Sequence, residues 1–148
     1  PAPPFKTIYV QPATNDSSAP QAQASLSAQI RQVLIRDGRV RLVSKPAEAD
    51  AILQINLTDY RRDSAIRSSE DSELALGFDL VLEARIALFD PSASKYLIKA
   101  RDLSANTSTF ASDPITGEDN FSLSEYQAMP RLTEDLANSI ADEILGVW

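Results

Sequence analysis

Alternating apolar and polar positions in the central part of the chain give its clearest structural pattern. Every even-numbered residue from Leu74 to Leu88 is apolar, and Asp79, Glu83 and Arg85 lie between them. An alternation with a period of two places the apolar side chains on one face of a β-strand and the charged ones on the other. A helix over the same residues would distribute the charges around its whole circumference. The pattern therefore predicts a long strand with one buried face and one open face.

Other segments also have strand character. They are residues 5–10, residues 40–43, a segment that begins at residue 51, and residues 96 to about 107. In the segment that begins near Ala51, the apolar residues Leu53, Ile55 and Leu57 alternate with polar ones, which again predicts a sheet with one wetter face. A turn-rich cluster at residues 90–94 separates the long strand from the last one, and this arrangement predicts an antiparallel hairpin.

Two segments have the apolar spacing of amphipathic helices. The first should begin at Pro20, where a first-turn proline is tolerated, and its apolar spacing starts from Ala22. Asp37 and Gly38 supply its C-terminal stop. The second follows Ser122, which forms a capping box with Glu125, and its apolar stripe runs from Tyr126 to Ile144. A proline at position 130 should kink this second helix or separate a short entry turn from the main helix.

The order of these elements predicts the fold class. The first strand, the first helix and the second strand form a crossover unit, whose two strands are expected to be parallel. We predict an α+β fold, a two-layer α/β sandwich in which two helices pack on one face of a mixed sheet of four to five strands. We expect one domain over residues 1–148, with an extended leader at residues 1–4 and a loop at residues 104–121.

Composition and charge exclude several classes of function. The 148 residues include no cysteine and no histidine, which removes thiol nucleophiles, disulfides, Cys/His zinc sites and the usual general base. Residues 1–67 carry a net charge of +3 and residues 68–148 a net charge of −10, without a sustained basic run that would favour nucleic acid. No segment is apolar over the length needed to span a bilayer. We therefore expect no metal and no cofactor.

A pair of carboxylates on the long strand is the nearest approach to a catalytic site. Asp79 and Glu83 share a face, but residues four apart along a strand are separated by roughly 13 Å, beyond the usual spacing in glycosidases. A solvated sheet face explains this pair better. The C-terminal Trp148 is either an exposed binding anchor or a cover for the edge of the core, and the second interpretation is favoured.

Basic residues offer a candidate binding site. Arg61 and Arg62 follow the strand that begins near Ala51, and Lys99 and Arg101 are expected on one face of the last strand. If these groups converge they can bind phosphates, because guanidinium and ammonium groups both pair with phosphate oxygens. On composition alone, ordinary exposed charges at the ends of a sheet are the favoured interpretation.

Three stretches of the sequence together carry a family resemblance. They are residues 5–12 (FKTIYVQP), residues 49–55 (ADAILQI), and residues 129–132 (MPRL) with the rest of the terminal helix through Ala137, Ile140 and Trp148. These stretches resemble the LptE family of outer-membrane lipoproteins, which assist lipopolysaccharide assembly. The order of elements matches as well. The resemblance implies a lipid-anchored plug that sits inside the LptD barrel at the periplasmic side of the outer membrane, contacts lipopolysaccharide and needs no catalytic residue or cofactor.

One feature departs from the family pattern. Members start their mature form at a lipidated cysteine, whereas this sequence starts at Pro1 and has no cysteine, so we expect an anchor upstream that has been removed. From charge and strand placement, Arg61, Arg62, Lys99 and Arg101 are the candidates for contacts to lipopolysaccharide phosphates.

Two other functions stay open at this stage. The chain can be a generic periplasmic lipoprotein domain that regulates a cell-wall enzyme by surface contact, since a fold does not dictate a function. An unrecognised hydrolase is the remaining reading, although no catalytic constellation supports it.

Overall fold

The computed structural model describes residues 2–19, 21–68, 74–110 and 121–148, with side chains at these positions except 64–68, 74–76, 110 and 121–124. The helices are α1 (Ala22–Asp37) and α2 (Phe121–Gly146), with a short 3-10 helix η1 (Pro46–Glu48). The strands are β1 (Thr7–Val10), β2 (Thr14–Asn15), β3 (Arg41–Leu42), β4 (Ala51–Ser68), β5 (Leu74–Asp90) and β6 (Lys95–Phe110).

The described strands form one mixed sheet. Its order is β3-β1-β4-β5-β6, and β2 pairs with β4 outside this path. β1 is parallel to both β3 and β4, whereas β4, β5 and β6 are antiparallel to one another. The predicted α+β class and the parallel crossover from β1 through α1 to β3 are confirmed. The sixth strand, β2, was not expected, because it is only two residues long within a turn-rich segment.

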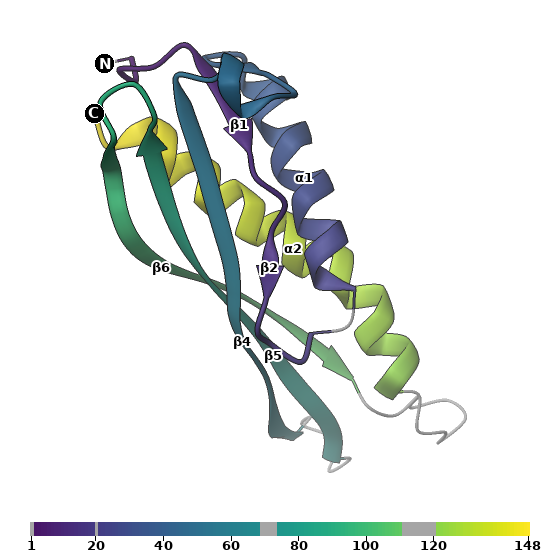
Figure 1. Ribbon diagram of the computed structural model, residues 1–148. Coiled ribbons are helices and arrows are strands. Elements are labelled where there is room, and N and C mark those ends of the chain that lie inside the picture. The colour runs from purple at the N-terminus through teal and green to yellow at the C-terminus, as the bar shows by residue number, and fades with distance from the viewer. Residues whose placement is uncertain (1, 20, 69–73, 111–120) are drawn as a thin grey trace.

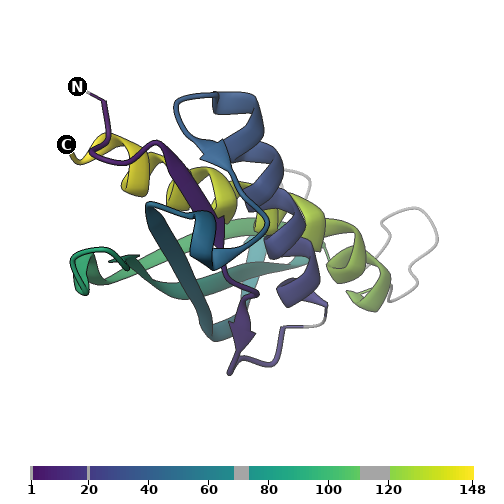
Figure 2. The same cartoon turned by 45° about the horizontal axis from the view of Figure 1, so that its top comes forward.

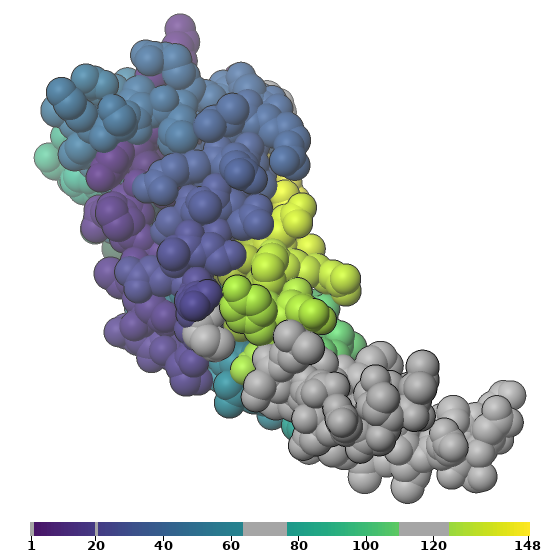
Figure 3. All heavy atoms as spheres, turned by 90° about the vertical axis from the view of Figure 1, so that its right-hand side faces the viewer, coloured from purple at the N-terminus to yellow at the C-terminus, as the bar shows by residue number. Residues whose placement is uncertain are grey.

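Both helices lie on one face of the sheet, and the opposite face has no helix over it (Figures 1 and 2). The chain ends lie close together at one end of the sheet, and the long β4–β5 hairpin extends to the other end (Figure 1). In the space-filling view, α1 and α2 lie side by side along the molecule (Figure 3). The Ser25 and Thr133 hydroxyls, 2.7 Å apart, join the two helices by a hydrogen bond. The sheet therefore has a covered face and an open face.

The alternation that predicted the long strand holds in β5. The side chains of Leu80, Leu82, Ala84, Ile86 and Leu88 are fully buried on the covered face. Leu74 and Leu76 belong to the same pattern, but their side chains lie outside the described residues. Burying each large aliphatic side chain contributes roughly 1.5 to 3 kcal/mol relative to leaving it exposed, so this face supplies much of the driving force for folding.

The C-terminal end of α1 follows from its sequence. Gly38, the predicted stop, has φ of 80° and donates its N–H to the Leu34 carbonyl at 3.3 Å. This positive φ is the left-handed conformation that glycine adopts without steric cost, so the helix ends where the sequence predicts. At the other end Gln21 also has a positive φ, and the helix begins at Ala22, later than the expected start at Pro20.

Helix α2 differs from its prediction in two respects. It continues through Pro130 as one helix, so of the two expected alternatives, a kink or a division into an entry turn and a main helix, the division is wrong. The ring removes the N–H that would bond to the Tyr126 carbonyl. The Tyr126 side chain is 66% exposed instead of belonging to the buried stripe, which starts at Met129. Tyr126 thus lies on the exposed side of α2, whereas the neighbouring Glu125 is buried.

The loop expected at residues 104–121 is wrong at both of its ends. β6 continues to Phe110, which pairs with Gly77, and α2 already begins at Phe121. Residues 104–110 read as polar because Ser104, Asn106 and other side chains of this strand face solvent, while Ala105 and Thr109 are buried. Residues 111–120 lie outside the described part of the chain.

Candidate binding surfaces

The four candidate basic residues do not form one cluster. Arg61 and Arg62 were expected after a strand, but β4 continues to Ser68 and includes both. Neighbouring residues of a strand point to opposite faces, and the contacts of Arg61 and Arg62 follow this rule. The second half of β4 was not predicted as a strand, because the apolar alternation ends near Leu57 and charged residues follow it.

Arg61 belongs to the open face. Its Nη1 lies 2.8 Å from a carboxylate oxygen of Asp59 and 2.9 Å from one of Glu83, so it bridges β4 and β5. The hydrogen bond to Glu83, followed by that to Asp59, raises the pKa of the Arg61 guanidinium. Almost half of the side chain remains exposed, so these ion pairs are largely screened by solvent.

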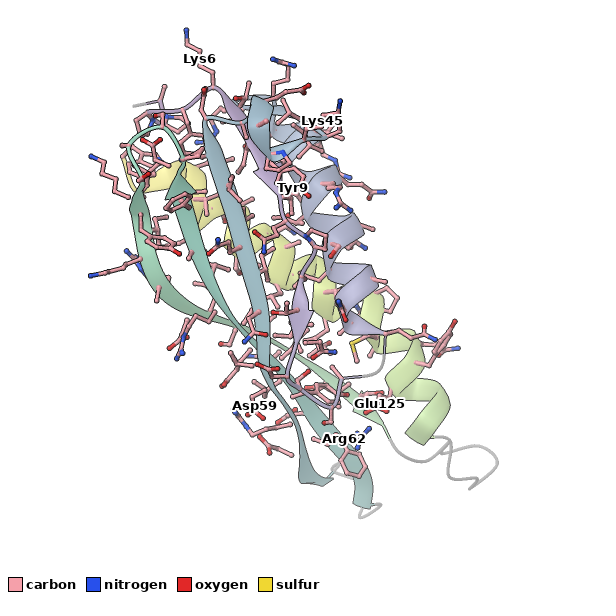
Figure 4. The ribbon with its side chains drawn as sticks, viewed as in Figure 1. Lys6, Tyr9, Lys45, Asp59, Arg62 and Glu125 are labelled. Atoms are coloured by element: carbon pink, nitrogen blue, oxygen red, sulfur yellow. The ribbon has the colours of Figure 1, made fainter. Side chains whose placement is uncertain are left out.

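Arg62 lies on the covered side and reaches α2. Its guanidinium makes a two-point contact with Glu125, and it also lies over the Tyr60 ring, 5.5 Å from the ring centre. The Tyr60 hydroxyl donates a 2.6 Å hydrogen bond to the same Glu125 carboxylate. Figure 4 shows Arg62 and Glu125 together at the end of the molecule opposite the chain ends. We call Tyr60, Arg62 and Glu125 the clamp, because they join the hairpin to α2.

Burial and charge act against each other in the clamp. Burial raises the pKa of Glu125, but the hydrogen bonds from Arg62 and Tyr60 and the charge of Arg62 together hold that pKa below its usual value. Burial, reinforced by the neighbouring Glu125 carboxylate, raises the pKa of the Tyr60 hydroxyl. Glu125 therefore stays ionised at neutral pH. The sequence assigned this residue to a capping box, but in the structure its carboxylate bonds to β4.

Lys99 and Arg101 were expected on one face, and this expectation is wrong. Ile86 pairs with Arg101 but Leu88 pairs with Ile98, so β6 has one extra residue between these two pairs. Such a β-bulge reverses the alternation of side chains along the strand. As a result Arg101 points to the helix side, where it pairs with Glu143 of α2, and Lys99 lies on the open face.

Two shallow hollows mark the open face. One, of about 340 Å³, is lined by Lys99 together with Gln54, Asn56 and Arg85. The other, of about 510 Å³, includes Arg85 as well and is otherwise lined mainly by polar and acidic side chains. Arg85 pairs with Asp102 at 2.8 Å across β5 and β6. No ion pair within the described chain engages the Lys99 ammonium, so it is the candidate best placed to meet a phosphate.

The pair of carboxylates on β5 has separate partners. Asp79 accepts a hydrogen bond from the Ser108 hydroxyl at 2.8 Å, and Glu83 pairs with Arg61. In the described ranges, no group of three or more acidic side chains is arranged to hold a metal ion. Among the described helices, none combines the length and the apolar character needed to cross a bilayer. The open face thus presents cross-strand charge pairs.

Trp148 covers the edge of the core, as the favoured interpretation predicts. Its ring packs edge-on against Phe5, with 6.1 Å between the ring centres, and its Nε1–H donates to the Ile144 carbonyl at 2.8 Å. This contact joins the two ends of the chain.

Sequence reasoning missed a row of apolar side chains on the open face. The strand pairing aligns Tyr9 with Ile52, Ile52 with Phe89, and Phe89 with Tyr96. We call these four residues the aromatic row. Apolar residues next to the inward-facing ones, such as Tyr9 and Ile52, were the available signal, but only the register across four strands shows that the members of the row are neighbours.

Comparison with known proteins gives a consistent family and fold. Residues 5–144 match the LptE family, which is described as lipopolysaccharide assembly. No curated protein sequence matches the chain.

Several solved structures share the fold at low sequence identity. A minor lipoprotein from Acinetobacter baumannii is 16% identical, with a TM-score of 0.61 over 95% of this chain and 90% of that one. PelC from Paraburkholderia phytofirmans, a dodecamer, is 12% identical, with a TM-score of 0.59 over 95% and 89%. A putative neuraminyllactose-binding hemagglutinin homolog from Helicobacter pylori is 12% identical, with a TM-score of 0.66 over 94% and 85%.

At such identities the structures show a shared fold and no shared function. The family match is different in kind, because it spans β1 through almost all of α2. The chain belongs to the LptE family of lipopolysaccharide-assembly proteins.

Proposed function

We propose that this chain is an outer-membrane lipoprotein adaptor that binds an LptD-type β-barrel and assists lipopolysaccharide assembly without catalysing a reaction. The observation that carries the proposal is the family match over residues 5–144, which includes α1, the described strands and almost all of α2. The proposed location is the periplasmic side of the outer membrane, with a lipid anchor joined upstream of this sequence.

The arrangement of the elements supports such a role. The N-terminus lies at one end of the sheet and the β4–β5 hairpin extends to the opposite end (Figure 1). A chain anchored through its N-terminus would keep the chain ends at the membrane surface and leave the hairpin end free to contact a barrel partner. Several charged groups of the open face, among them Arg61, Glu83 and Arg85, form pairs across strands, which suits a recognition surface better than a reaction centre.

Lipopolysaccharide contact through the four basic residues is part of the proposal. Arg61 and Lys99 share the open face, separated by about six residues along the strands, or roughly 20 Å. Arg62 and Arg101 face the helix side, where Glu125 and Glu143 already engage them. We therefore propose Lys99 as the first phosphate contact. Arg61 would make a second phosphate contact by exchanging its carboxylate partners for the phosphate. Arg62 and Arg101 are weaker candidates.

A charge reversal tests this contact. Lys99→Glu should weaken binding of purified lipopolysaccharide to the chain about ten-fold, because a repulsive charge replaces an attractive one. Lys45→Glu is the matched control, since Lys45 is also an exposed lysine without an ion pair in the described chain, on a different surface. Equal loss in both variants would show a general charge effect, and unchanged binding in Lys99→Glu would remove Lys99 from the site.

Isolation of the intact protein from its own cell tests the partner. The tagged natural protein, with its upstream region, is purified from outer membranes in mild detergent, and the associated proteins are identified by mass spectrometry. An LptD-type barrel in stoichiometric amount is the expected result. A peptidoglycan synthase in its place would contradict the proposal and favour a regulator of a cell-wall enzyme.

A further inference from the structure

We propose that the aromatic row, Tyr9, Ile52, Phe89 and Tyr96, is a contact surface for the headgroup region of a phospholipid bilayer. This function is separate from lipopolysaccharide binding at Lys99 and from the contact with the barrel. It rests on the strand register and on the lysines around the row, and only the orientation toward the membrane draws on the proposed anchor.

The row forms a continuous apolar strip across the open face. Its members occupy four adjacent strands, β1, β4, β5 and β6, so the strip is about 14 Å wide at the usual strand spacing. The Phe89 and Tyr96 rings meet edge to face, with 5.0 Å between their centres. Tyr96 is 45% exposed, and the other three members are half-buried. The open face farther along the strands is polar, so the row stands apart from it.

The row lies at the end of the sheet that holds both chain ends. Tyr9 is in β1, and Tyr96 is the second residue of β6, next to the β5–β6 turn (Figure 4 labels Tyr9 and Lys6). An anchor joined before Pro1 would bring this end of the sheet to the bilayer. A lipid anchor alone leaves the domain free to turn relative to the bilayer, and a second contact at the interface would fix its orientation. The aromatic row is in the right place to supply that contact.

Two lysines border the row. Lys6 and Lys95 line one hollow of about 460 Å³ together with Asp50 and Asp90. Asp50 accepts the backbone N–H groups of Lys6 and Thr7, at 3.0 and 3.2 Å. Asp90 accepts the Ser92 and Ala93 N–H groups and the Ser92 hydroxyl.

The donors engage one oxygen of each carboxylate, Oδ2 of Asp50 and Oδ1 of Asp90. The Ser92 hydroxyl and, to a lesser degree, the nearby charge of Lys95 lower the pKa of Asp90. Neither Lys6 nor Lys95 forms an ion pair among the described residues. Their ammonium groups can therefore turn to lipid phosphates.

The chemistry of the row favours a lipid surface over a protein. Tyrosine combines an apolar ring with a polar tip, and lysine combines an apolar stem with a charged head, so both residue types settle at the boundary between lipid and water. A specific protein interface usually buries about 800 Å² on each partner, which is more than four half-buried side chains supply. A shallow lipid contact has no such minimum when an anchor assists it.

Flotation of the purified chain with vesicles tests the proposal. The vesicles contain phosphatidylethanolamine and phosphatidylglycerol, without lipopolysaccharide or any barrel, and the experiment is done at low salt. The unmodified chain should float with the vesicles. Tyr96→Ser should reduce the bound fraction about five-fold, because it removes the most exposed ring of the row. Lys95→Gln should reduce it less, and more strongly at low salt than at high salt.

Matched variants separate this contact from general effects. Tyr126→Ser is the control for the aromatic change, because Tyr126 is 66% exposed on α2. Arg131→Gln is the control for the charge, since Arg131 is exposed on the same helix and has no ion pair within the described chain. Both controls should bind vesicles as the unmodified chain does. Far-ultraviolet circular dichroism and the urea midpoint verify that each variant is folded.

Several results would overturn the proposal. They are the absence of vesicle binding by the unmodified chain, equal binding by Tyr96→Ser, and an equal loss in Tyr126→Ser. A dimer in sedimentation experiments that Tyr96→Ser dissociates would assign the row to a second copy of the chain. Because the vesicles contain neither barrel nor lipopolysaccharide, failure here leaves the adaptor proposal standing, and failure of barrel co-purification leaves the vesicle result standing.

Discussion

The covered and the open face of β5 are built from the same 17 residues, yet they differ in composition and in what they do. On the covered face, five successive inward residues from Leu80 to Leu88 are fully buried under the helices. On the open face, Glu83 and Arg85 pair with charged side chains of the neighbouring strands, and Phe89 joins the aromatic row. Stability is concentrated on one face, and the residues available for recognition are on the other.

The clamp is an exception to this division, because it places a charged contact on the covered face. Arg62 and Glu125 form a charged pair on the helix side, at the end of the sheet where β4 extends beyond its apolar part. Removing one member of a buried charged contact costs more than removing an exposed pair, because the remaining groups lose their partner. Substitutions should therefore lower the free energy of unfolding most on the covered face, less in the clamp and least on the open face.

The largest effect is expected on the covered face. Leu82→Ala removes a fully buried side chain and leaves a cavity, so the free energy of unfolding should fall by about 2 to 5 kcal/mol. Urea unfolding followed by circular dichroism measures it. Val81→Ala, the adjacent residue on the open face, is the control and should cost about 1 kcal/mol or less. Equal losses at both positions would contradict the division between the faces.

The clamp should give the next largest effect. Glu125→Ala takes away the acceptor for both Arg62 and Tyr60, and a loss of about 1 to 3 kcal/mol in the free energy of unfolding is expected. Tyr60→Phe removes one donor and leaves the Arg62 contact, so its effect should be smaller. If Tyr60→Phe proved as destabilising as Glu125→Ala, the charged contact would have no role in holding the hairpin to α2.

Acid should lower the free energy of unfolding, because several carboxylates have a lowered pKa in the folded protein. The Arg62 and Tyr60 contacts keep the pKa of Glu125 below its usual value despite burial, and backbone hydrogen bonds lower that of Asp50. Groups of lower pKa in the folded state bind protons more weakly there, so their stabilisation is present above the unfolded pKa and is lost as the pH falls through the folded one.

The urea midpoint measures this dependence. Between about pH 7 and pH 3 it should fall, mostly below about pH 4.5. Glu125→Gln and Asp50→Asn should each flatten the curve. A midpoint that rises on acidification would reverse the assigned sign, and unchanged curves in both variants would mean that other carboxylates are responsible.

The smallest effect is expected for an exposed pair on the open face. Asp102→Asn removes the partner of Arg85, but both side chains are more than half exposed, so solvent and salt already screen the interaction. The urea midpoint should stay within experimental error of the unmodified protein. A clear loss of stability would show that the open face takes part in holding the fold together.

The main elements of the fold could be predicted because their signals are local. The alternation in β5, the apolar spacing of α1 and the stop at Gly38 each depend on neighbouring residues. β6 was predicted only to about residue 107, because an edge strand with polar side chains on its open face looks like a loop. The helical spacing on both sides of Pro130 was present in the sequence, but the sequence could not show whether the helix continues through the proline.

The candidate site was harder to predict because it depends on register. Lys99 and Arg101 are two residues apart, and only the bulge in β6 sends them to opposite faces. Arg62 was recognised as a basic residue, but its partner Glu125 lies 63 positions away on α2. The aromatic row has the same origin, since its members are separated in sequence and become neighbours only when four strands align.

The central claim is that this protein supports lipopolysaccharide assembly through its open face, and replacement of the natural gene tests it most directly. The natural protein is depleted in its own cell, and surface lipopolysaccharide is measured by antibody binding while plasmid variants are expressed. We predict that depletion lowers surface lipopolysaccharide, that Lys45→Glu restores it, and that Lys99→Glu restores it poorly at equal protein level. Unchanged surface lipopolysaccharide after depletion, or full rescue by Lys99→Glu, would contradict the account.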